Sequence, residues 1–292
     1  MSEKPPTRND PPTGLPQLTG FLLRRAYARA ADCAQACIGE DMRVRDVVHL
    51  ALLAERGAMS QRQLAEITHV NPTTMVKLVD SLEERGWVVR ERNPEDRRSY
   101  ALRLTELGDK ALSNLRHELD DAERILTQAL TSRQRGRLRR HLRALLHGEA
   151  WMVVDSLAGH NGFLIAQAHR QVRGWAVDAL APLGLDPRDF GILSTVGREQ
   201  PCSQNQLAQA LGVSPPAALS FVDELEEAGL VSRERNAADR RYYDLTLTPA
   251  GERRLADARK AAAKVQARIV DRLGDEDDEE LRSLLTRIIS AP

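Results

Sequence analysis

The chain contains the same sequence twice. Residues 60–108 and 203–251 align without a gap at an offset of 143 residues and agree at 26 of 49 positions. Solenoid repeats recur every ~20–50 residues, so this longer period indicates two copies of a complete small domain. A chain of 292 residues is long enough to bury two hydrophobic cores.

Composition limits the class of protein. No stretch approaches the ~18 consecutive apolar residues of a membrane helix, so we expect no membrane partner. Residues 1–17 hold five prolines and no apolar signal core, which predicts a flexible tail. Three cysteines make no disulfide framework, which favours the cytosol. We predict a tail over 1–18, domains over 19–146 and 163–292, and a linker over 147–162.

Apolar periodicity predicts mainly helical structure. Apolar residues recur every three or four positions over 21–38 and 165–179, and further helices are expected at 44–56 and 187–198. Ser60 and Ser203 are typical N-caps of a short helix. Asn71 and Ser214, each followed by proline, are typical N-caps of a second helix after a tight turn, so each copy contains a helix-turn-helix.

The second helix of each pair shows an apolar stripe. The expected buried residues are Val76, Val79 and Leu82 in the first copy and Leu219, Val222 and Leu225 in the second. Valine-, leucine- and tyrosine-rich runs around a polar turn then predict a β-hairpin in each copy, which makes a winged helix. Long helices over 105–130 and 248–273, and closing helices over 132–147 and 275–290, complete the repeats.

The wing region carries the residues of a known family. Each copy has Asp-x-Arg in the hairpin, Asp96 with Arg98 and Asp239 with Arg241, followed by Leu-Thr-x-x-Gly. With the order of the helices, this resembles the MarR family of bacterial winged-helix regulators, most strongly over 44–110 and 187–253. The resemblance implies a transcriptional regulator, often a repressor, that binds double-stranded operator DNA as a dimer and is released by a small ligand. Two copies in one chain then suggest an intrachain pseudo-dimer, with a dimer of chains as the alternative.

Short polar side chains at the start of a recognition helix suit the major groove, and an arginine at a wing tip suits the narrow minor groove. On this basis Arg97 and Arg240 are the expected wing-tip contacts. Alanine-rich Pro215–Ser220 has lost the lysine and threonines of the first copy, so its half-site should be recognised more loosely. The complete set of expected DNA-binding residues is Ser60, Gln61, Asn71, Thr73, Thr74, Lys77, Arg97, Arg98, Ser203, Gln204, Ser214, Ser220, Arg240 and Arg241.

Four residues are expected to support the wings without touching DNA, because a free carboxylate beside phosphate is repelled. Asp96 and Asp239 are expected to hold a neighbouring arginine, and Arg90 and Arg233 are among the arginines available.

The resemblance places ligand pockets between the helical interface and the winged helices. Tyr27, Cys33, His169 and Trp175 lie on the first-helix stripes and are the expected ligand-binding residues, with core packing as the alternative for each. Trp175 offers a stacking face, so an aromatic or phenolic ligand is expected.

Other functions remain open or are disfavoured. Cys33 and Cys37 allow a redox switch, although their place on an apolar stripe favours packing. The histidines show no ligand spacing with cysteine or carboxylate, and no phosphate loop or nucleophile elbow occurs, so we expect no metal, cofactor or catalysis. Two further alternatives are an architectural DNA binder that ignores ligands and a regulator in which only the first repeat recognises sequence.

Overall fold

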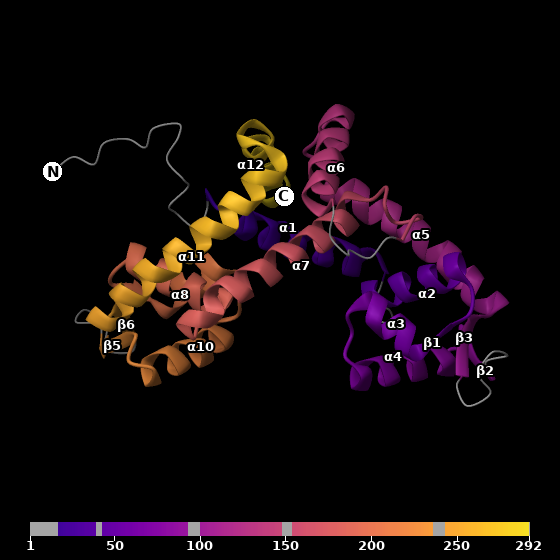
Figure 1. Ribbon diagram of the computed structural model, residues 1–292, viewed down its shortest axis with the longest axis horizontal. Helices are drawn as coiled ribbons and strands as arrows, with labels where there is room; N and C mark the ends of the chain where they lie inside the picture. Colours follow the sequence, from indigo (N-terminus) through magenta and orange to yellow (C-terminus); the bar gives the residue numbers. More distant parts are fainter. Residues whose placement is uncertain (1–16, 39–42, 93–99, 148–153, 236–242, 292) are drawn as a thin grey trace. The chain divides into compact units, whose positions relative to one another are not determined.

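The computed structural model describes residues 17–38, 43–92, 100–147, 154–235 and 243–291 (Figure 1). The expected mainly helical fold with two winged helices is confirmed. Repeat 1 contains α1 (Thr19–Ile38), α2 (Val44–Arg56), β1 (Met59–Ser60), α3 (Gln61–Thr68), α4 (Pro72–Glu84), β2 (Val88–Arg92), β3 (Tyr100–Leu104), α5 (Glu106–Leu126) and α6 (Ser132–Leu146). Repeat 2 contains α7 (Asn161–Leu180), a 3-10 turn (Ala181–Leu183), α8 (Pro187–Arg198), β4 (Cys202–Ser203), α9 (Gln204–Leu211), α10 (Pro215–Glu227), β5 (Val231–Arg235), β6 (Tyr243–Leu247), α11 (Pro249–Leu273) and α12 (Asp275–Ser290).

One helix end differs from the expected one. The long helix predicted over 105–130 stops at Leu126. The Thr127 hydroxyl donates to the Glu123 carbonyl, and the Leu130 amide donates to the Thr127 carbonyl, so a turn replaces the last helical residues. Among the described residues, the helices lack the combination of length and apolar character that crossing a bilayer would require.

The chain divides into two compact units. The repeat-1 unit comprises Ala26–Ala168 and Leu284–Pro292, and the repeat-2 unit comprises Met1–Arg25 and His169–Ser283. Each winged helix is therefore packed with the beginning of a helix whose remainder belongs to the other unit: α7 begins in the repeat-1 unit, and α1 begins in the repeat-2 unit.

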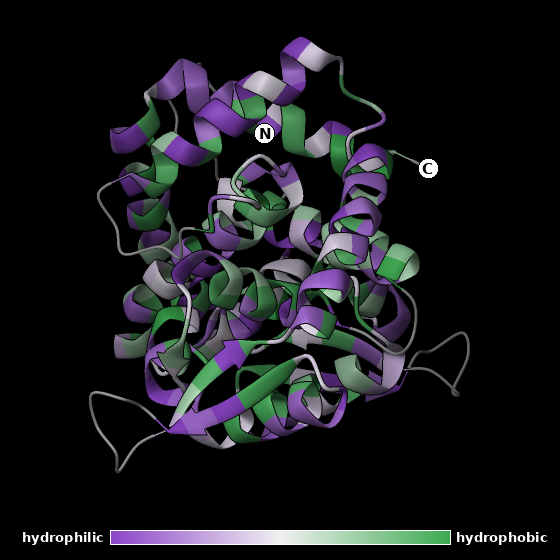
Figure 2. Cartoon of the chain, turned by 90° about the vertical axis from the view of Figure 1, so that its right-hand side faces the viewer, coloured by the Kyte–Doolittle hydropathy of each residue, from purple (hydrophilic) through white to green (hydrophobic). Residues whose placement is uncertain are grey.

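Each winged helix has a three-stranded antiparallel sheet, in the order β1-β3-β2 in repeat 1 and β4-β6-β5 in repeat 2. The registers match, since Val88 pairs with Leu104 and Val231 with Leu247. Along the strands and helices, hydrophobic and hydrophilic residues fall on different faces (Figure 2), and apolar residues form a buried cluster in each unit.

The Leu-Thr-x-x-Gly motif forms the corner between the hairpin and the long helix. The Thr105 hydroxyl accepts from the Gly108 amide at 3.0 Å, which caps α5, and donates to the Gly86 carbonyl at 2.6 Å. A Cβ at Gly108 would lie 2.1 Å from the Trp87 carbonyl oxygen, so only glycine fits. Thr248 and Gly251 repeat this corner in the second copy.

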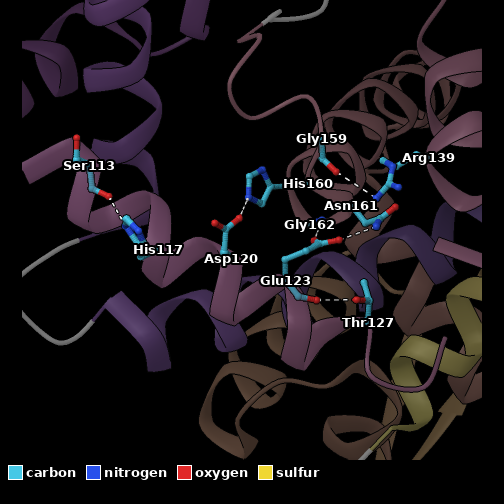
Figure 3. Close-up of polar contacts among 10 residues, drawn as sticks. All are labelled: Ser113, His117, Asp120, Glu123, Thr127, Arg139, Gly159, His160, Asn161 and Gly162. Carbon is cyan, nitrogen blue, oxygen red and sulfur yellow. Dashed lines mark hydrogen bonds and ion pairs between the residues drawn. The ribbon is translucent and has the colours of Figure 1, made fainter. Parts of the chain in front are cut away.

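The segment that leads into α7 is docked on the repeat-1 unit. Val154 and Leu157 are buried in its core, and the Glu55 carboxylate accepts hydrogen bonds from the Asp155 and Ser156 amides at 2.9 Å. Farther along, His160 Nε2 lies 2.9 Å from Asp120 on α5 (Figure 3). Residues 154–160 are therefore fastened to the unit.

The first residues of α7 are attached to α5. The Asn161 side-chain amide donates to Glu123 at 2.6 Å and the Gly162 amide donates to the same carboxylate at 3.1 Å (Figure 3). A carboxylate at the positive end of a helix is favourable, because the first amides of a helix have no intrahelical acceptor.

The first residues of α1 are attached to α11 in the matching way within the repeat-2 unit. The Thr19 amide donates to Gln266 Oε1 at 3.1 Å, and the Thr19 hydroxyl donates to Asp278 at 2.5 Å. Gln266 in turn donates to Asp278 at 2.9 Å. Gln266 follows Glu123 by the repeat offset of 143 residues. The two anchors are thus the same structural feature of the two copies.

Candidate nucleic-acid interface and ligand cavity

The recognition helix of repeat 1, α4, begins at a well-formed cap. Asn71 accepts from the Thr74 amide at 2.8 Å, and Pro72 occupies the first helical position. Thr73 and Lys77 are exposed, and Thr74 is half-buried. A hydroxyl and a cation therefore face solvent near the start of this helix, a chemistry suited to a major groove.

Burial along the recognition helices corrects the sequence interpretation at one position in each copy. Val76 and Leu219 were expected in the core but are 43% and 39% exposed. Met75 and Leu78 in α4 turn inward instead, because the stripe that faces the core continues through 75, 78, 79 and 82. Exposed Val76 and Leu219 occupy matching positions and offer apolar groups suited to thymine methyls, a signal that the sequence pattern concealed.

The recognition helix of repeat 2, α10, is also capped, since Ser214 accepts from the Ala217 amide at 3.4 Å. Ser220 is exposed, whereas the positions matching Thr73 and Thr74 are proline and alanine. The two recognition surfaces therefore differ in hydrogen-bonding capacity.

The first helices of the two helix-turn-helix motifs begin with capping boxes. Ser60 accepts from the Gln63 amide at 3.1 Å, and Ser203 accepts from the Gln206 amide at 3.2 Å. These serine hydroxyls thus have structural partners, while Gln61 and Gln204 are half-buried at the first helical positions.

Each wing is fastened to its recognition helix by an arginine. Arg90 on β2 donates to Asp80 at 2.5 Å and to Glu83, both on α4. Arg233 on β5 makes the same contacts with Asp223 and Glu226, the latter at 3.1 Å. The acids that hold these arginines thus lie on the last turn of each recognition helix.

Six of the expected residues belong to the sequence between the two paired strands of each hairpin. Asp96, Arg97, Arg98, Asp239, Arg240 and Arg241 lie outside the described residues. Their assignment as DNA-contacting or wing-supporting residues stays a prediction.

The repeat-2 unit contains a cavity of about 230 Å³. Its walls come from α1, α7, α8 and α11 and from α9 and α10, the two helices of the helix-turn-helix. Apolar groups dominate, with Phe21, Phe190 and Phe221 among them, and Arg24, His169, Arg173, Arg188 and Gln266 supply the larger polar groups. A mostly apolar cavity with a few converging polar groups is typical of a small-molecule site.

The arginines of the cavity differ in whether an acidic side chain neutralises their charge. Arg188 lies over the Phe221 ring at 4.5 Å and pairs with Glu224 at 2.7 Å. Within the part of the chain that the structure describes, Arg24 and Arg173 have no acidic partner. The cavity therefore carries uncompensated positive charge.

The expected ligand-binding residues are dispersed. His169 lines the cavity. Trp175 is 8% exposed, is absent from the cavity wall, and has the guanidinium groups of Arg268 and Arg272 over its ring at 4.0 and 4.9 Å. Tyr27, 41% exposed, and Cys33, buried, belong to the repeat-1 unit.

The two buried cysteines, Cys33 and Cys202, are held in the protonated form at neutral pH. Burial raises the pKa of Cys202 to about 11 and also raises the pKa of Cys33. Because the thiolate is the reactive form, this environment favours packing over redox chemistry for both residues.

His169 should make the stability of the protein depend on pH. Burial, and then the charges of Arg173, Arg24 and Arg170, lower its pKa from 6.5 to about 4. Between those pH values the unfolded chain binds a proton that the folded chain does not, so stability present above pH 6.5 is lost as the pH falls towards 4. Urea unfolding at pH 7 and pH 4.5 measures this decrease in the free energy of unfolding. We expect the decrease to be smaller in His169→Gln than in the parent by about 2–3 kcal/mol. Exposed His117 provides the control, and an equal pH dependence in His169→Gln, His117→Gln and the parent would contradict the expectation.

Two capped helix-turn-helix motifs, each with a hairpin tied to its recognition helix, define a DNA-binding winged-helix protein. Two models described as MarR family match the chain, one over residues 45–100 and one over residues 183–241. The chain is also 31% identical over 140 residues to a transcriptional regulatory protein assigned to the hcr operon of Thauera aromatica, covering 48% of this chain and 84% of that protein. The chain belongs to the MarR family of DNA-binding transcriptional regulators and contains two copies of its winged helix.

Two solved structures align with a little under half of the chain. The repressor CouR bound to a 23-mer DNA duplex is 30% identical, with 46% of this chain and 95% of that chain covered and a TM-score of 0.45. CouR from Rhodococcus jostii RHA1 bound to p-coumaroyl-CoA is 30% identical, with 45% and 92% covered and a TM-score of 0.42.

Proposed function

We propose that one chain binds operator DNA as an intrachain pseudo-dimer and releases it when a small aromatic anion occupies the repeat-2 cavity. The observation that carries the pseudo-dimer is the reciprocal pair of anchors. Thr19 of the first copy binds Gln266 of the second, and Asn161 of the second copy binds Glu123 of the first. A twofold relation between copies produces such matched contacts, which in a homodimer would join two chains.

Two winged helices in one chain support binding to two half-sites. We keep 19–146 and 163–292 as the proposed domains, with 147–162 as the proposed linker and 1–18 as a tail. When paired half-sites lie one helical turn apart, about 34–36 Å, both recognition helices can enter the major groove from one side.

The chemistry of the cavity supports the ligand. Phe21, Phe190 and Phe221 suit an aromatic ring, and the uncompensated charges of Arg24 and Arg173 suit a carboxylate. The cavity is lined by α8, α9 and α10, so its shape depends on how the helix-turn-helix is arranged. A ligand that binds more tightly to an arrangement that does not match the operator shifts the protein towards that arrangement.

The function is tested by footprinting the purified protein on the DNA flanking its own coding sequence and then titrating the protected duplex with aromatic acids. We expect protection of two adjacent major grooves and a fall in affinity of at least tenfold with an effective acid. A protected duplex whose affinity no aromatic acid alters would favour the second candidate, an architectural DNA binder that ignores ligands.

The difference between α4 and α10 predicts unequal half-sites. Lys77→Ala should weaken binding about tenfold through one half-site, because a cation that reaches a base or phosphate is lost, whereas Ser220→Ala at the matching position should change affinity less than about threefold. Footprints on duplexes with one half-site scrambled measure the two effects separately. Equal losses at both half-sites would show that the copies recognise DNA alike.

A further inference from the structure

Arg24 reaches from the first copy's helix into the helix-turn-helix of the second. It lies on the part of α1 that belongs to the repeat-2 unit, and its guanidinium donates to the carbonyl oxygen of Leu211, the last residue of α9. Its guanidinium also lies 5.8 Å from the centre of the Phe21 ring, at the wall of the cavity.

The Leu211 carbonyl needs a donor from outside its helix. A helical carbonyl accepts from the amide four residues later, but that residue is Pro215, which has no N–H. The amides of Gly212 and Val213 are used by the Ala208 and Gln209 carbonyls. A guanidinium at this place both satisfies the carbonyl and balances the negative end of the α9 dipole.

Resting on the proposed function, we infer that Arg24 is a latch on the α9–α10 turn, and that an anionic ligand in the cavity opens it by capturing the guanidinium. A guanidinium has five N–H groups, and Arg24 donates one of them to Leu211. Arg24 also lines the cavity, so its other N–H groups can donate to a ligand there. A carboxylate offers two oxygens to the planar guanidinium and binds it more strongly than one carbonyl does. The α9–α10 turn, and with it the start of the second recognition helix, then loses its external support.

Among the described residues, the first winged helix has no counterpart of this latch on α7. Ala26 on α1 matches Ala168 on α7, so the residue that matches Arg24 is Ala166. The alanine side chain has no hydrogen-bond donor. A ligand that acts through Arg24 therefore changes the second DNA-binding head and leaves the first unchanged.

Hydrogen exchange of the full-length protein tests the latch without knowledge of the operator. Arg24→Met keeps the apolar stem and removes the guanidinium, and Arg25→Met is the matched control, because Arg25 is exposed on the next position. We expect amides in 210–218 to exchange about tenfold faster in Arg24→Met than in the parent, with α11 unchanged, and to exchange at the parental rate in Arg25→Met. Parental exchange in Arg24→Met, or faster exchange throughout the unit, would overturn the latch.

The second arm adds 4-hydroxybenzoate or the uncharged 4-hydroxybenzamide to the parent. The acid should accelerate exchange at 210–218 and have no such effect in Arg24→Met, and the amide should leave the parent unchanged. Equal effects of acid and amide, or no effect of the acid on the parent, would overturn capture of Arg24 by an anion. Faster exchange with the acid but unchanged operator affinity would leave the latch standing and refute release of DNA, so the two failures are distinguishable.

Discussion

Changing Arg97 and Arg240 together to alanine is expected to weaken operator binding by about 10- to 100-fold. Each belongs to an Asp-Arg-Arg sequence between two paired strands, the first of which Arg90 or Arg233 holds against the recognition helix. A wing held in this way can place its tip in the narrow minor groove, where an arginine is strongly attracted. The slope of log affinity against log salt should fall by about 0.9 for each phosphate contact that is lost.

The control for this pair changes the same net charge elsewhere. Arg124 on α5 and Arg259 on α11 are exposed and lie on the long helices instead of the winged helices. Arg124→Ala with Arg259→Ala should leave affinity within about threefold of the parent. If the wing variant retained parental affinity, footprint and salt slope, the wing-tip assignment would be wrong.

Gly108→Ala is expected to destabilise the repeat-1 unit by more than about 3 kcal/mol. Its new Cβ would lie 2.1 Å from the Trp87 carbonyl oxygen, a backbone atom fixed by the Thr105 amide that donates to it at 3.0 Å. Neither partner can move without breaking the corner that joins the hairpin to α5, and forced backbone shifts of this kind give the largest single-residue effects. Gly251→Ala should do the same in the repeat-2 unit, at 2.0 Å from the Leu230 carbonyl oxygen.

Gly136 provides the opposite case. It lies inside α6, and a Cβ there meets nothing within 4 Å. Gly136→Ala should raise stability by about 0.5–1 kcal/mol, because alanine loses less conformational entropy than glycine in a helix. Urea unfolding of the three variants measures the contrast, and similar stabilities for Gly108→Ala and Gly136→Ala would refute the steric explanation.

Local signals predicted most of the fold. Serine and asparagine caps, proline at first helical positions and apolar periodicity depend on residues within one or two turns, and Ser60 and Asn71 cap the helices as expected. The repeat itself predicted that both copies fold alike. The prediction that Val76 and Leu219 are buried is wrong, because two adjacent apolar residues in each helix fit the stripe and only tertiary packing selects between them.

Contacts between residues that are far apart in the sequence could not be predicted from local patterns. Arg90 was expected to serve the wing, but nothing local indicates that Asp80 and Glu83 on the recognition helix hold it. The two guanidinium groups over Trp175 come from α11, nearly 100 residues away in sequence, and they occupy the ring that was expected to stack on a ligand. The role of Arg24 could not be predicted from the sequence, because its partner is a backbone carbonyl of the other copy.

We expect one chain to supply both halves of a DNA-binding pseudo-dimer. Light scattering of the purified protein, alone and bound to the footprinted duplex, tests it most directly. The free protein should have a mass near 32.5 kDa at low concentration, and the complex should contain one chain per duplex with two half-sites protected. A stable free species of twice that mass, or a complex that requires two chains for two half-sites, would contradict the claim and indicate a dimer of tandem chains.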